Sequence, residues 1–146
     1  MEQAQGILEG LDERQRTAAT TLQGPVRIIA GAGAGKTRTV TRRIAYACAT
    51  GAWKPERVLA VTFSVKAAAE MRARLGQLGV GGGTGRSGLG AGTAGVTAAT
   101  FHSAALHQLN SVWADICEAP FPHVIEDQRD VVSRAIIRAT ARTDAD

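Results

Sequence analysis

The sequence has few cysteines and no apolar run long enough to span a membrane. Cys48 and Cys117 stand far apart, without the spacing of a metal site. This argues against a disulfide framework and predicts two buried free thiols in a reducing compartment. The polar, slightly acidic start at residues 1–5 does not resemble a secretory signal. We therefore expect a cytoplasmic protein without a membrane segment.

Lysine is also scarce, so the net charge of +4 comes almost entirely from arginine. Such a balance permits an anionic partner such as nucleic acid but does not require one. The length of 146 residues is enough for one domain with a sizeable core.

A glycine-rich stretch at residues 30–37 has the pattern of a phosphate-binding loop. It lies between a strand-like run at 25–29 and a helix-like run at 38–50, which is the context that this motif requires. Glycines let backbone N–H groups approach a phosphate chain, Lys36 supplies a cation for the β- and γ-phosphates, and the Thr37 hydroxyl can bind Mg²⁺. The alternative is a flexible turn that happens to carry a lysine. The predicted nucleotide contacts are Ala30, Gly31, Ala32, Gly33, Ala34, Gly35, Lys36, Thr37 and Arg38.

Periodicity predicts alternating helices and strands. We expect helices over 7–23, 36–50, 66–77, 101–116 and 126–140, and strands over 26–30, 57–62 and 96–100. Nine of the 17 glycines fall in residues 79–95, which predicts a flexible loop there. The alternation predicts an α/β fold, a parallel sheet flanked by helices, with ligands at the carboxyl ends of the strands. Polar and aromatic residues lie at or after the carboxyl ends of all three predicted strands, where ligands would bind. They are Lys36 and Thr37 for the first strand, Thr62 and Phe63 for the second, and Thr100, Phe101 and His102 for the third.

Four ordered motifs resemble the N-terminal part of superfamily 1 DNA helicases of the UvrD/Rep/PcrA type. They are Leu11-Asp12-Glu13-Arg14-Gln15, the loop at 30–37, the run from Val58 to Met71 that resembles motif Ia, and Thr100-Phe101-His102-Ser103, which resembles motif Ib. The match covers residues 8–115. Ser64 and Val65 stand where the family usually has Thr-Asn, and Ala34 stands where a hydroxyl residue is common. The glycine-rich stretch between motifs Ia and Ib is an unusual insertion that only lengthens a loop.

The resemblance implies a RecA-like P-loop NTPase fold, incomplete here. It implies ATP and Mg²⁺ as cofactors and single-stranded or duplex DNA as partner, with the oligomeric state unknown. Residues 1–118 would be the start of the ATP-binding motor domain and 119–146 the start of a helical insertion. Lys36 and Thr37 would be catalytic, Thr37 would be the metal ligand, and Gln15 would read adenine. The implied DNA contacts are Thr62, Phe63, Lys66, Thr100, Phe101 and His102.

Each of these residues also has a simpler interpretation. Gln15 and Lys66 could be solvated helix residues, Phe63 could fill the core at a strand end, and either threonine could cap a helix. His102 is singled out only by its motif. We expect Arg38 near the nucleotide, and Arg42 and Arg43 at the surface.

Phosphoryl transfer by P-loop enzymes needs an acidic residue on Mg²⁺ and a transition-state arginine. No apolar run ending in Asp-Glu follows Ser103; Val124-Ile125-Glu126-Asp127 comes nearest, in reversed order. We therefore expect the front part of a helicase, inactive alone and marginally stable or prone to aggregate, because two strands would lack neighbours. The alternatives are a non-catalytic remnant that binds nucleotide or nothing, a helicase–nuclease recombination subunit and, more weakly, an unrelated P-loop kinase or GTPase.

Overall fold

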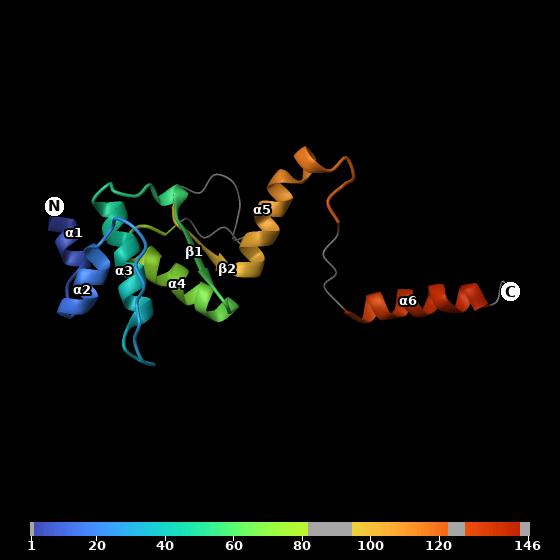
Figure 1. Ribbon diagram of the computed structural model, residues 1–146, viewed down its shortest axis with the longest axis horizontal. Helices are drawn as coiled ribbons and strands as arrows, with labels where there is room; N and C mark the ends of the chain where they lie inside the picture. The colour runs from blue at the N-terminus through green and yellow to red at the C-terminus, as the bar shows by residue number, and fades with distance from the viewer. Residues whose placement is uncertain (1, 82–94, 123–127, 144–146) are drawn as a thin grey trace. The chain divides into compact units, whose positions relative to one another are not determined.

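The structure is a computed structural model that describes residues 2–81, 95–122 and 128–143 (Figure 1). The chain forms two compact units, Met1–Gln108 and Leu109–Asp146. Both predicted functional clusters lie in the first unit, so its architecture positions the sites.

The first unit contains a two-stranded parallel sheet. β1 (Leu59–Thr62) pairs with β2 (Thr97–Thr100), and Thr62 is in register with Thr100. An isolated bridge between Gly81 and Val96 extends the pairing by one step. Parallel strands need a crossover connection, and helix α4 (Val65–Gln77) provides it and packs on both strands. The described part is therefore α/β with a parallel sheet, as the alternation predicted.

The main hydrophobic core joins this sheet to two helices. Leu75 of α4 is fully buried, and Ile44 of α3 (Lys36–Ala49) lies in the same cluster. Val40 packs at its edge and Ala47 is fully buried, so one face of α3 is buried. The remaining buried members of the core are Ala60, Met71, Val96 and Ala98.

The predicted lead-in helix at 7–23 is two short helices, α1 (Glu2–Ile7) and α2 (Glu13–Thr20). The chain turns between them at Gly10, whose φ of 70° favours glycine. Asp12 then starts α2 with a capping box that it shares with Gln15. Both helices lie beside α3, in the part of Figure 1 near the N-terminus.

The predicted strand at 26–30 is wrong for this structure. Residues 25–30 have no regular secondary structure, and the Ile29 side chain is 79% exposed. A β-strand is stabilised by hydrogen bonds to a neighbour, and among the described residues none pairs with this segment. The β-branched residues of this segment favour an extended conformation, but they do not provide the neighbouring strand that a sheet requires.

A short 3₁₀ turn, η1 (Pro55–Arg57), precedes β1.

The two C-terminal helices agree closely with the sequence periodicity. Helix α5 (Phe101–Ile116) has the predicted bounds. In the second unit, α6 (Gln128–Thr143) covers the described part of the helix predicted at 126–140 and extends three residues beyond it, and its Val131 and Ile136 side chains are exposed. Most of the predicted flexible loop, and the run Val124–Asp127, lie outside the described residues.

Candidate nucleotide and nucleic-acid sites

The loop at 30–37 leads directly into α3. Gly33 and Gly35 have φ values of 75° and 76°, and Gly35 is the N-cap of the helix. The first N–H groups of a helix have no partner within it, and the helix dipole makes that end partly positive. The Thr37 hydroxyl belongs to an exposed residue in this first turn. The loop therefore presents donors and positive potential to solvent, an arrangement that can bind an anion.

Lys36 adds a full charge to the loop. Its Nζ donates hydrogen bonds to the carbonyl oxygens of Ala30 at 2.8 Å and of Gly31 at 2.6 Å. The side chain therefore folds back over the loop, and the cation is held beside the backbone N–H groups that would meet a phosphate.

Gln15 reaches the loop from α2. Its Nε2 donates to the carbonyl of Ala34 at 3.2 Å, and its Oε1 accepts from the Asp12 N–H at 3.2 Å. The Gln15 residue is half-buried, and both its amide nitrogen and its amide oxygen are hydrogen-bonded. The structure thus places Gln15 against the loop, 19 residues away in sequence.

Three arginines of α3 bind carbonyls of the N-terminal helices. Arg38 donates to Gly10 at 2.8 Å, Arg42 to Ile7 and Glu9, and Arg43 to Ala18 and Thr21. Arg42 and Arg43 were expected at the surface, and both are half-buried there, with their guanidinium groups bonded to the N-terminal helices. Burial lowers the pKa of both guanidinium groups, and the charge of Arg38 lowers that of Arg42 further. Arginine composition alone gave no indication of these bonds.

A second cluster lies where the paired strands end. The Phe63 and Phe101 rings are 5.0 Å apart between centroids and tilted by 40°. Phe63 is 92% exposed and Phe101 is 46% exposed, so the interpretation of Phe63 as a core residue is wrong. The register of Thr62 with Thr100 brings the rings together, because each phenylalanine directly follows one of these paired residues. Two exposed rings side by side form a surface on which a nucleic-acid base can stack.

The polar residues of this cluster serve local structure. The Thr62 hydroxyl donates to the Ser64 carbonyl at 3.0 Å. The Thr100 hydroxyl accepts from the Ser103 N–H at 3.1 Å, as a helix cap does. Lys66 and His102 are exposed. The structure therefore gathers all six predicted DNA-contact residues at the ends of β1 and β2, with both threonine hydroxyls engaged in their own turns.

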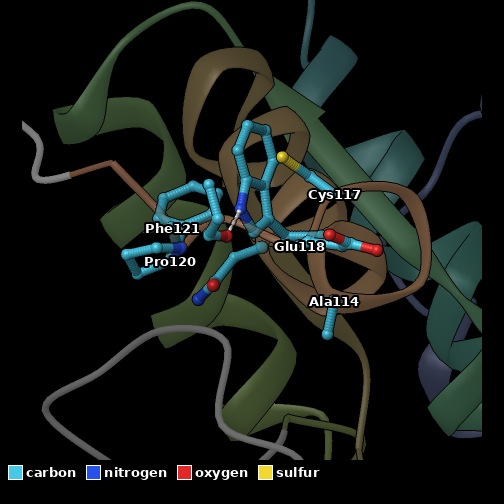
Figure 2. A pocket seen from close by; sticks show the side chains of 8 residues that line it. Ala114, Cys117, Glu118, Pro120 and Phe121 are labelled. Atoms are coloured by element: carbon cyan, nitrogen blue, oxygen red, sulfur yellow. Dashed lines mark hydrogen bonds between the residues drawn. The ribbon is translucent and has the colours of Figure 1, made fainter.

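A cavity of about 520 Å³ lies at the end of α5 in the second unit, and no sequence pattern pointed to it. Pro120 and Phe121 line one side and Cys117 and Glu118 the other (Figure 2). The Trp113 indole donates to the Ala119 carbonyl at 2.7 Å and meets Phe121 edge to face. These contacts fix the chain reversal after α5.

Within residues 2–81, 95–122 and 128–143, no helix has the length and apolar character to cross a bilayer. No group of three or more metal-binding side chains gathers in the same ranges.

Comparison with known proteins gives a consistent result. The profile of the UvrD/REP helicase N-terminal domain matches residues 11–145. The chain is 43% identical over 140 residues to the ATP-dependent DNA helicase UvrD2 of Mycobacterium tuberculosis, covering 96% of this chain and 19% of that helicase. It is 41% identical to the ATP-dependent DNA helicase PcrA of Bacillus subtilis, over 66% of this chain and 12% of PcrA. It is 39% identical to DNA helicase II of Escherichia coli, over 70% of this chain and 13% of that protein.

Proposed function

This chain belongs to the UvrD/REP helicase family, matching its N-terminal domain, and from that membership we propose that it is the ATP-binding portion of a DNA helicase. In this proposal the described part is a piece of a RecA-like motor fold. The intact machine would use ATP to move along DNA and unwind it, as the names of the relatives indicate for those proteins. The observation that carries the proposal is the meeting of Gln15 with the glycine-rich loop that starts α3.

The donors present fit a nucleoside triphosphate. The N–H groups of residues 30–37 and the helix N-terminus suit the phosphate chain, and Lys36 matches its charge. Gln15 carries both a donor and an acceptor, which is what the edge of adenine requires. Thr37 offers one oxygen to Mg²⁺, which commonly keeps several waters and takes other ligands from the phosphates.

Direct binding of a fluorescent ATP analogue to the full chain tests this site. We expect Lys36→Ala to abolish binding and Lys54→Ala, which removes an exposed lysine outside the loop, to leave it unchanged. Equal affinities of the two variants would contradict the proposal.

We propose that the ends of β1 and β2 hold single-stranded DNA. The support is the exposed Phe63–Phe101 pair, since base–aromatic stacking contributes about 1–3 kcal/mol per base and tolerates any sequence. Phe63→Ala should therefore weaken binding of an oligonucleotide by roughly fivefold or more. Phe121→Ala, at the third phenylalanine of the chain, is the matched control. If both variants bind alike, the aromatic pair is not the DNA surface.

We further propose that this chain binds ATP without turning it over. Hydrolysis needs an acidic Mg²⁺ ligand and a transition-state arginine, and no apolar run ending in Asp-Glu follows Ser103 in this chain. Phosphate release by the purified chain that disappears in Lys36→Ala would overturn this part and leave the binding site standing.

A further inference from the structure

The C-terminal ends of α1 and α2 are capped by another helix. Neither α1 nor α2 has a basic residue in its last turn, although the last carbonyls of a helix lack partners and attract cations. Arg42 of α3 donates to the carbonyls of Ile7 and Glu9 at the end of α1. Arg43 donates to the carbonyls of Ala18, at 2.8 Å, and Thr21 at the end of α2. The two arginines therefore supply what the N-terminal helices lack.

Helix α2 depends on such contacts for its position. It has eight residues, and isolated helices shorter than about 12 residues are marginal in water. Ala19 is fully buried and packs in a small cluster with Leu8 and Leu11, against Tyr46 of α3. Tertiary contacts with α3 thus hold α2, and the Arg43 bonds are its polar anchor at the C-terminal end.

The same helix carries Gln15 near its other end. The Gln15 amide lies against the loop through its bond to Ala34. Because Gln15 and the carbonyls that Arg43 binds lie on or next to the same eight-residue helix, a shift of the C-terminal end of α2 would move the backbone that carries the Gln15 amide.

Arg43 is itself held in place. Its guanidinium lies 5.3 Å from the centroid of the Trp53 ring, within cation–π range. The backbone N–H of Trp53 donates to the Ala47 carbonyl of α3 at 3.1 Å, which fixes the backbone that carries the ring to the helix that carries Arg43. A continuous set of contacts therefore runs from Trp53 through Arg43 and α2 to Gln15.

We propose that Arg43 is a positioning residue for the choice of nucleotide base, acting through α2 on Gln15. The inference rests on the proposed ATP site. It deepens that site, because it assigns base selection to a residue that touches no nucleotide. An amide distinguishes adenine from guanine only when its donor and acceptor are held in register with the base edge. Loosening α2 removes that discrimination, whereas the loop and Lys36 keep their affinity for the phosphate chain.

The test compares three competitors of a fluorescent ATP analogue on the full chain: ATP, GTP and inorganic tripolyphosphate. Arg43→Lys keeps the charge but replaces a planar fork of donors with a single ammonium. We expect it to lower the ATP-over-GTP preference by roughly tenfold, the effect of weakening two hydrogen bonds, with tripolyphosphate affinity unchanged. Arg14→Lys, at an exposed arginine of α2, should retain the ATP-over-GTP preference. Gln15→Ala, which removes the amide itself, should show the lowest preference of the variants.

Each result decides something. If the wild-type chain binds none of the competitors, the nucleotide site itself fails and the inference falls with it. If the wild type prefers ATP and Arg43→Lys keeps that preference, or loses tripolyphosphate affinity in parallel, the inference alone is wrong. Should Arg43→Lys lose helical circular dichroism, Trp53→Phe replaces it, since it weakens the ring contact and keeps the arginine. An unchanged ATP-over-GTP ratio in Trp53→Phe then overturns the inference.

Discussion

Alanine substitutions at Gly31 and Gly35 should have opposite effects on the stability of the ligand-free chain. Gly35 has a φ of 76°, whereas Gly31 is not among the glycines with positive φ. A Cβ at Gly35 would lie 3.1 Å from the Gln15 Nε2, whereas a Cβ at Gly31 would meet nothing within 4 Å. The two positions thus share one loop and one substitution but differ in backbone conformation.

The magnitude follows from two terms. Replacing glycine with alanine reduces the freedom of the unfolded chain, which stabilises by about 0.4–1 kcal/mol where the backbone is compatible. Both variants share this term, so their difference isolates the native-state strain, about 1–2 kcal/mol for alanine in the left-handed region. We therefore expect Gly31→Ala to be the more stable by that amount, and to be slightly more stable than wild type.

Urea denaturation followed by far-UV circular dichroism measures this difference. With a slope of about 2 kcal/mol per molar urea, the midpoints should differ by roughly 0.5–1 M. In a Gln15→Ala background, the cost of Gly35→Ala should fall, since the contact with the amide is gone. Equal midpoints for Gly31→Ala and Gly35→Ala would refute the backbone conformation described for the loop.

Three further predictions concern the first unit. Ser64→Ala removes the hydroxyl that accepts a hydrogen bond from the Ala67 N–H at the start of α4. We expect the free energy of unfolding, measured by urea denaturation, to fall by about 1 kcal/mol. A fall of less than about 0.3 kcal/mol would contradict the role of Ser64 as a cap. Leu75→Ala empties a fully buried site and should lower the free energy of unfolding by about 2–5 kcal/mol; a small change would place Leu75 outside the core. Burial and the charge of Glu56 raise the pKa of the Cys48 thiol in the folded chain. The protonated thiol therefore contributes stability at pH values below the unfolded pKa of about 8.5, and this contribution is lost as the pH rises through the folded pKa. The alkaline loss of stability should accordingly be shallower in Cys48→Ala, and identical pH profiles would contradict this.

Local patterns predicted the features that local physics determines. The bounds of α5 follow from its periodicity, a capping threonine and the break before Pro120. The parallel pairing of β1 with β2 follows from the crossover through α4, because a short parallel connection is not possible. The resemblance to the helicase motifs implied that Gln15 lies near the nucleotide, and its amide does contact the loop.

Long-range contacts could not be predicted in this way. The role of Arg43 depends on carbonyls 22 and 25 residues earlier in the chain, which no spacing rule connects to it. The exposure of Phe63 depends on what covers the sheet edge, which its own motif does not specify. The unpaired segment at 25–30 shows the same limit, since a strand exists only together with its neighbour.

The unpaired segment and the conformation of Lys36 are linked through one carbonyl. Ala30 ends the segment that was expected to be a strand, and its carbonyl accepts from the Lys36 Nζ, as does that of Gly31. In a sheet, backbone carbonyls along a strand bond to a neighbouring strand, whereas here the lysine satisfies these two. A bound triphosphate would attract the same ammonium. Nucleotide binding and pairing of residues 25–30 would therefore both weaken the hydrogen bonds between Lys36 and the loop carbonyls. Pairing would give the Ala30 carbonyl another partner and weaken the hold of the loop on Lys36. Pairing of this segment should therefore raise the affinity of the loop for ATP, and ATP should in turn favour the paired segment by the same factor.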